Sequence, residues 1–171
     1  GSDNTAIGSY SLTNNSTGGN NTAVGYTALQ DNTTASNNTA VGYAALVANT
    51  TGTENVAVGT SALAANTTGS DNIAIGYQAL DANTTTAYNV AIGQGALGAN
   101  TAHSNTAVGR HAMILNTTGT ANVSFGYGSL AANTTASNNT AVGYQALAAN
   151  TTGTANVALG YLALTSNTTA S

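Results

Sequence analysis

Apolar and polar residues recur along this chain in one short pattern that repeats from one end to the other. One clear copy, N-T-A-V-G-Y-Q-A-L-A-A-N-T-T-G-T-A, covers residues 139–155. We number the repeat from its first Asn, so that Asn139 stands at position 1 and Ala155 at position 17. Position 5 is Gly in all ten copies, and the interval is constant except between the sixth and seventh copies, where it is shorter by one. These glycines are Gly8, Gly25, Gly42, Gly59, Gly76, Gly93, Gly109, Gly126, Gly143 and Gly160.

Positions 1–5 are typical of a β-strand, because β-branched residues alternate there with Ala and Gly. Residues at positions 2 and 4 would share one face of the strand, and Ala and Gly the other. Position 9 is Leu in every copy except Met113, and position 4 is always apolar. We therefore predict that positions 4 and 9 form the core, with the mixed Thr, Val and Ile of position 2 at a boundary or an interface. The residues at position 4 are Ile7, Val24, Val41, Val58, Ile75, Ile92, Val108, Phe125, Val142 and Leu159.

The length of the repeat favours a coil of strands and turns, since positions 1–17 leave too little chain for two helices and a turn. Asn recurs at positions 1 and 12, where the chain must turn. Asn tolerates a left-handed backbone, and its amide can bond the coils above and below. The sequence thus predicts an all-β fold, a parallel β-solenoid (β-roll) of ten coils that is ~45 Å long at the usual strand spacing.

One repeat domain is expected over residues 4–171, with ten repeats, one of them shortened at residues 102–104 (Ala102, His103 and Ser104). Residues 1–3 are expected to be a cloning scar and a partial repeat. Neither end carries a capping segment, so we expect the chain to be an excerpt of a longer protein.

The composition excludes several function classes. Charged residues make up 4% of the chain, the net charge is −4 and Arg110 is the one basic residue, so we expect no nucleic-acid binding. No apolar run approaches the ~18 residues of a membrane span, so we expect no membrane insertion. There is no Cys, and His103 and His111 lack a third metal ligand. With no catalytic motif either, we predict no catalytic residue, no metal, no cofactor and no enzyme activity.

The segments N-V-A-V-G (residues 55–59), N-I-A-I-G (72–76) and N-V-A-I-G (89–93) resemble the N-S-V-A-I-G repeat of YadA-like heads of trimeric autotransporter adhesins. Arrays of N-T-A-V-G-Y-x-A-L are similar to those of phage tail-fibre-type proteins. The resemblance extends from Asn4 to the end of the chain. It implies a left-handed β-roll, a homotrimer, and a surface that binds host cells or matrix. The present repeat is longer than the common head repeat, and the added residues lie in N-T-T-[GA]-[ST].

A T-x-[ST] pattern at positions 14 and 16 is the first candidate binding surface. If it lies on a strand, its residues share one face about 7 Å apart, and the coils supply the other spacing. Ice-binding solenoids present such flat, uncharged lattices, although Thr and Ser also simply suit turns and exposed strands. The candidate residues are Thr34, Ser36, Thr51, Thr53, Thr68, Ser70, Thr118, Thr120, Thr135, Ser137, Thr152 and Thr154.

A Tyr column at position 6 is the second candidate. Aligned aromatic rings can bind carbohydrate or protein, or can simply pack along the solenoid. Thr60, Gln94 and Arg110 interrupt the column. Its members are Tyr26, Tyr43, Tyr77, Tyr127, Tyr144 and Tyr161.

The leading hypothesis is a structural and adhesive module of an extracellular, cell-surface or virion fibre, which presents Asn, Thr and Tyr ladders to a host-cell, matrix or glycan surface. The alternative is an ice-binding solenoid that uses the T-x-[ST] face. A passive stalk that binds nothing is a third hypothesis. If chains associate as a homotrimer, we expect contact through the smooth Ala and Gly columns at positions 3 and 5.

Overall fold

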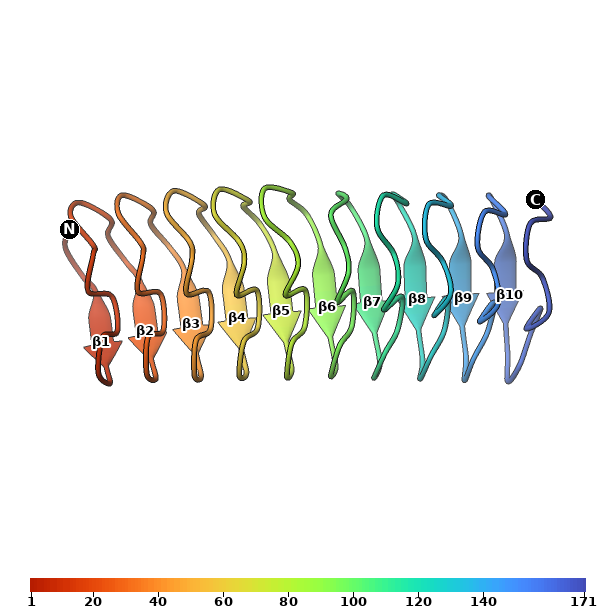
Figure 1. The fold of residues 1–171 in the computed structure, drawn as a ribbon, viewed down its shortest axis with the longest axis horizontal. Helices are drawn as coiled ribbons and strands as arrows, with labels where there is room; N and C mark the ends of the chain where they lie inside the picture. Colours follow the sequence, from red (N-terminus) through yellow and green to blue (C-terminus); the bar gives the residue numbers. More distant parts are fainter.

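Each sequence repeat forms one coil of a parallel β-solenoid in the structure, a computed structural model that describes residues 1–171. One short strand per coil contributes to a single parallel sheet in sequence order, with the termini at opposite ends of the rod (Figure 1). The predicted fold class is confirmed. The strands are β1 (Thr5–Ile7), β2 (Thr22–Val24), β3 (Thr39–Val41), β4 (Val56–Val58), β5 (Ile73–Ile75), β6 (Val90–Ile92), β7 (Thr106–Val108), β8 (Val123–Phe125), β9 (Thr140–Val142) and β10 (Val157–Leu159).

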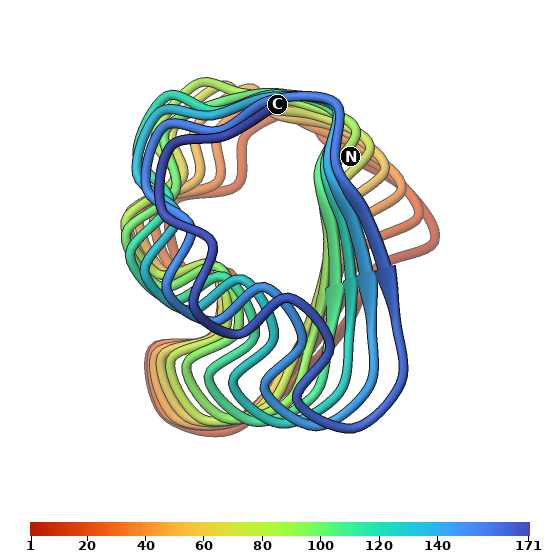
Figure 2. The same ribbon diagram turned by 90° about the vertical axis from the view of Figure 1, so that its right-hand side faces the viewer.

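Hydrogen bonds join the coils around the whole perimeter and not only along the strands. Of 107 backbone–backbone hydrogen bonds, 18 lie within strands. Outside the sheet, Leu29 N donates to Ala45 O at 3.0 Å, which ties one coil to the next. Successive coils therefore superpose with a small progressive shift when viewed along the rod (Figure 2).

The interior of the coil is narrow and is filled by small residues around one Leu. Leu at position 9 is buried as predicted, for example Leu46 and Leu63 at 0% exposure. The prediction for position 4 is wrong, because Val41 is half-buried and Phe125 is 48% exposed on the outer face of the sheet. The inward residue is instead the one at position 3, which is Ala in every strand except β8.

Coil 8 shows what position 3 faces. There Ser124 and Ser129 replace the usual Ala at positions 3 and 8, and both are fully buried. Their hydroxyls hydrogen-bond to each other, and Ser124 Oγ donates to Ser129 O at 2.9 Å. Positions 3 and 8 therefore meet across the interior, where a β-branched side chain would have no room beside the Leu.

Two Asn ladders run inside the solenoid at positions 1 and 12. At position 12, Asn66 Nδ2 donates to Asn49 Oδ1 of the preceding coil at 2.9 Å and to Gly69 O at 2.9 Å. At position 1, Asn55 N donates to Asn38 Oδ1 at 3.0 Å. No buried side-chain nitrogen or oxygen lacks a hydrogen-bond partner. The predicted ladders are therefore present, but they are buried and contribute nothing to the outer surface.

Left-handed backbone occurs at positions 7, 9 and 17 and not at the Asn ladders, contrary to the prediction. In coil 3, for example, φ is 53° at Ala44 and 52° at Leu46, and the preceding turn has φ of 63° at Asn37. The buried Asn side chains form hydrogen bonds between coils. Asn is therefore needed at these positions for its amide group and not for its tolerance of positive φ.

The shortened coil lacks the second Thr of the repeat. Thr101 N donates to Thr117 O at 2.9 Å, so Thr101 keeps position 13. Asn100 Nδ2 donates to Ala102 O at 2.7 Å, as the position-12 Asn does to position 15 elsewhere. The missing residue therefore belongs to position 14. The position-1 ladder continues through coil 6, where Asn105 N donates to Asn89 Oδ1 at 3.0 Å, but the position-12 ladder is broken between Asn83 and Asn100, because Asn83 Oδ1 accepts from the Thr86 hydroxyl instead.

Two glycines with opposite roles give a matched stability prediction. A Cβ at Gly109, where φ is +137°, would lie 2.4 Å from Gly126 O, so Gly109→Ala should cost at least about 3 kcal/mol. A Cβ at Gly98 would approach no atom closer than 3.4 Å, and three other coils carry Ala at that position. Gly98→Ala should raise stability by about 0.4–1 kcal/mol. Urea denaturation followed by circular dichroism tests both; equal effects would contradict the assignment.

The Asn ladder gives a second prediction. Asn66→Ala leaves Asn49 Oδ1 without its donor and removes the oxygen to which Asn83 Nδ2 donates at 2.9 Å. An unpaired buried polar group costs about 1–3 kcal/mol, so the variant should unfold at clearly lower urea concentration. Thr68→Ala, at an exposed residue of the same turn, is the control and should stay within about 0.5 kcal/mol. Similar losses in both variants would argue against the ladder.

Candidate functional site

The surface of the solenoid offers rows of side chains and no enclosed site. The structure contains no pocket. No three His, Cys, Asp or Glu side chains lie together as a metal-binding group. No helix is long and apolar enough to cross a membrane. Any binding surface must therefore be built from equivalent residues on successive coils.

The T-x-[ST] residues lie in the connection between strands, and the two positions differ in role. At position 14, Thr34, Thr51 and Thr68 are exposed, and their hydroxyls take no part in the hydrogen bonds of the chain. At position 16, by contrast, Ser70 Oγ accepts from Thr53 N at 3.0 Å, and Ser137 Oγ accepts from Thr120 N at 3.0 Å.

The same division holds along the rod. Ser36 Oγ accepts from Gly19 N at 3.0 Å, so the Ser hydroxyls at position 16 serve to join coils. The free row is position 14, and coil 6 lacks it. The predicted array therefore reduces to a single exposed row of Thr on each side of that coil, namely Thr34, Thr51 and Thr68 before it and Thr118, Thr135 and Thr152 after it.

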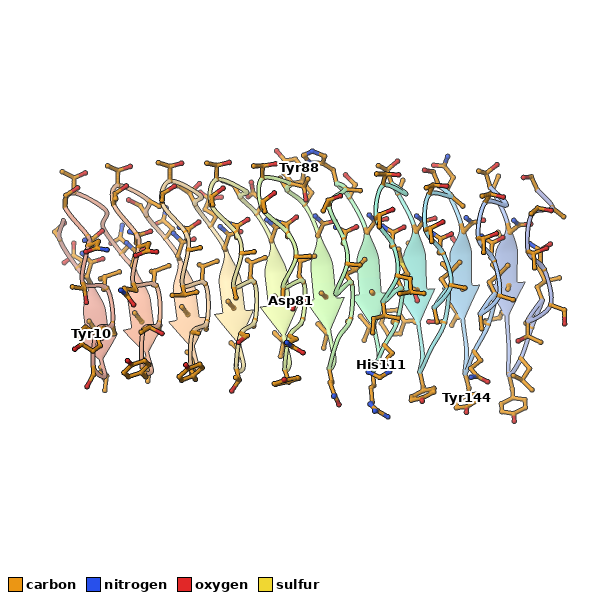
Figure 3. The ribbon with its side chains drawn as sticks, in the orientation of Figure 1. Tyr10, Asp81, Tyr88, His111 and Tyr144 are labelled. Atoms are coloured by element: carbon orange, nitrogen blue, oxygen red, sulfur yellow. The ribbon has the colours of Figure 1, made fainter.

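The Tyr column forms two stacks that project from the lower edge of the coil, where Tyr144 is labelled (Figure 3). In the first, the ring centroids of Tyr26 and Tyr43 lie 5.6 Å apart with planes at 7°. In the second, Tyr144 lies 5.3 Å from Tyr127 and 5.4 Å from Tyr161. Because the planes are nearly parallel while the centroids lie more than 5 Å apart, the rings are stacked with an offset, and each covers only part of its neighbour's face.

Tyr77 lies between the two stacks without an aromatic partner and is 50% exposed. Thr60 separates it from Tyr43, and Gln94 and Arg110 separate it from Tyr127. The Arg110 guanidinium lies 5.8 Å from the ring centroid of Tyr127, and Arg110 Nε donates to Gln94 Oε1 at 3.2 Å. Arg110 therefore caps the second stack.

Tyr10 belongs to the first stack, although the sequence pattern does not show this. Its ring lies 5.7 Å from that of Tyr26 at an interplanar angle of 85°. Tyr10 stands at position 7, one residue after the column, and Ser9 occupies position 6 in that coil. The repeat spacing does not predict this contact, because it forms only when the Tyr10 side chain is directed towards the next coil.

The two His residues have structural contacts. His103 Nδ1 accepts a hydrogen bond from Ala87 N at 3.0 Å, which is the bond that Ser makes at position 16 in other coils. The His111 ring lies 6.5 Å from that of Tyr127. The two are at different places on the coil, and neither has a carboxylate partner, so they form no joint site.

The environment of Asp81 changes the titration of its carboxyl. Burial raises the pKa of its carboxyl, and hydrogen bonds from the backbone N–H groups of Asp81 and Ala82 oppose that rise. Gly98 occupies the equivalent position in the next coil and has no side chain, which leaves space beside the Asp81 carboxyl. A Cβ at Gly98 would lie 3.6 Å from Asp81 Oδ1. The Asp81 carboxyl lies on a flank of the rod (Figure 3).

The raised pKa of Asp81 predicts a pH dependence of stability. A folded-state pKa above the unfolded value means that the fold is stabilised below the unfolded value, about 3.9, and loses this stability as pH rises through the folded value. Asp81→Asn should therefore be more stable than the wild type at pH 7, with the difference shrinking towards pH 3. Thermal unfolding across this range measures it. Asp81→Ala, which copies the residue of Ala64, should behave alike; a variant that loses stability at pH 7 would contradict the account.

Comparison of the chain with protein-family models, with curated proteins and with solved structures gave no match. The similarity to YadA-like heads therefore depends on the repeated N-[VI]-A-[VI]-G segments alone. What the sequence and structure establish is a repeat protein with a parallel β-solenoid fold, buried Asn ladders and exposed clusters of Tyr.

Proposed function

We propose that this chain is a structural and adhesive module of an extracellular fibre or adhesin head, which binds a host-cell, matrix or glycan surface and catalyses no reaction. The observation that carries the proposal is the combination of a stiff, nearly uncharged rod with exposed Tyr stacks repeated at the coil spacing. Tyr26, Tyr43 and Tyr144 are 48%, 57% and 44% exposed, so part of each ring and its hydroxyl are available to a partner.

Adhesion by such a rod uses many weak contacts. The surface has no pocket that could bury a ligand, so each contact with a partner is shallow. Equivalent contacts on successive coils add up, because a second contact made by a bound rod is intramolecular. A rod held together by hydrogen bonds around its perimeter keeps those contacts aligned.

We further propose that the module is a homotrimer, as the resemblance to adhesin heads implies. The expected contact through the Ala column is excluded, since Ala57, Ala74 and Ala91 are buried at 0% exposure inside each coil. The outer face of the sheet, at positions 2 and 4, supports trimer formation better. Position 4 is apolar in every coil and position 2 is Val or Ile in five of the ten, and Ile73 and Ile75 are each 37% exposed.

Ice binding is the second candidate function, and the exposed Thr row at position 14 favours it. These hydroxyls are free of bonds within the chain, as a surface that orders water requires. Against it, the row lies outside the sheet and is interrupted at coil 6. Thermal hysteresis that is lost in Thr51→Tyr and Thr118→Tyr would support ice binding over adhesion.

Molar mass in solution and binding to a surface test the proposal together. We expect a species of three times the chain mass of 16.6 kDa. Ile73→Glu with Ile75→Glu places charges on the outer face of the sheet and should give monomers. Retention of the wild type on immobilised matrix proteins, glycans or cells should exceed that of the monomer by about 10²-fold, as avidity predicts.

Val47→Glu, on another face of the coil, is the matched control and should change neither the mass nor the retention. A well-folded wild type that binds none of these surfaces would overturn adhesion in favour of a passive stalk. A monomeric wild type would overturn the trimer. The binding assay would then test adhesion by the single chain.

A further inference from the structure

We infer that the gap in the Tyr column at Thr60 is a binding slot for one neutral sugar ring, with Tyr43 and Tyr77 as its walls. This inference rests on the proposed adhesive function, for which it names a ligand class. The observation behind it is that the chain itself provides no aromatic or cationic contact to Tyr43 or Tyr77 across the coil of Thr60.

The ends of the two Tyr stacks are covered wherever the chain supplies a suitable group. Tyr10 covers Tyr26 at a centroid distance of 5.7 Å. Arg110 covers Tyr127 at 5.8 Å, and its bond to Gln94 fills the second interruption of the column with side chains of the chain itself. The break at Thr60 is different, because neither an aromatic ring nor a cation lies on the facing sides of Tyr43 and Tyr77.

The width of this gap matches one ring. Tyr43 and Tyr77 are two coils apart, and at the usual strand spacing equivalent positions two coils apart are separated by about 10 Å. A ring placed midway would lie at the spacing that the Tyr stacks already have, which falls within the about 4.5–7 Å of favourable aromatic contacts. Thr60 is shorter than Tyr, so the outer part of the gap is open.

The chemistry of the gap points to a neutral sugar. Its walls are Tyr rings, 57% exposed at Tyr43 and 50% at Tyr77. Thr60 and Ser61 contribute hydroxyls and Gln78 an amide, whereas positions 5–7 of these three coils carry no charged residue. A pyranose combines apolar C–H faces, which stack on aromatic rings, with hydroxyls that bond such uncharged groups at its edge. An aromatic side chain of a partner protein would stack on the two Tyr rings but would leave the hydroxyls of Thr60 and Ser61 and the amide of Gln78 without hydrogen-bond partners.

Titration of the full chain with cellotetraose, followed by amide NMR shifts, tests the slot. We expect saturable shifts centred on Gly59, Thr60 and Ser61, with a dissociation constant of about 1 mM for one weakly held ring. Thr60→Tyr inserts the residue that this column carries in other coils and should abolish these shifts. Thr60→Ala keeps the gap open and should change the affinity by less than about threefold.

A relocated slot provides the sharpest control. In the Thr60→Tyr background, Tyr144→Thr opens the same gap between Tyr127 and Tyr161, whose rings flank Tyr144 at 5.3 Å and 5.4 Å. The double variant should regain binding, with shifts centred on coil 9. Circular dichroism checks that each variant remains folded.

The outcomes separate this inference from the proposed function. Absence of shifts in coil 4 of the wild type, or equal shifts in Thr60→Tyr, would overturn the slot. If the wild type still adheres to cells or matrix in that case, adhesion stands and the slot alone fails. Shifts in coil 4 without adhesion would support the slot and overturn the broader proposal.

Discussion

The buried amide of Asn connects the sequence repeat to the fold more directly than any other group. Each coil contributes two Asn side chains to the interior, and each amide bonds a neighbouring coil as well as its own turn, as Asn66 does with Asn49 Oδ1 and Gly69 O. A buried amide without partners would destabilise the fold, so one coil can form this interior only when another lies in register upon it. Stacking and folding are therefore one process in this chain.

The narrow interior decides which residues face outward. Ala at position 3, Ala at position 8 and Leu at position 9 fill the coil, and the paired serines of coil 8 show how closely the first two approach. Since the strand alternates, filling the inside with Ala places Val, Ile and Thr on the outside. The solenoid thus has an apolar outer strip as a direct consequence of its small core. That strip is available for association between chains.

Residues that depart from the repeat give single coils contacts that the other coils lack. A coil that follows the consensus presents the same surface as its neighbours, whereas Thr60, Arg110 and His103 each change the local contacts. The side chains of Arg110 and His103 contact other residues of the chain: Arg110 lies over the Tyr127 ring, and His103 accepts a hydrogen bond from Ala87 N. Thr60 instead leaves ring faces open. In a rod of this kind, an interruption can therefore be a more specific feature than the repeated row that it interrupts.

The sequence by itself determined the solenoid, the number of coils, the buried Leu column and the presence of Asn ladders, because these follow from the constant period of the repeat and from residue chemistry. Only the tertiary structure decided which side of the strand faces inward, since alternation is the same for both choices and the width of the coil selects Ala over Val. It also decided that Ser70 joins coils while Thr68 remains free, and that Tyr10 joins Tyr26. These outcomes depend on how neighbouring coils approach one another, which spacing along a single chain does not specify.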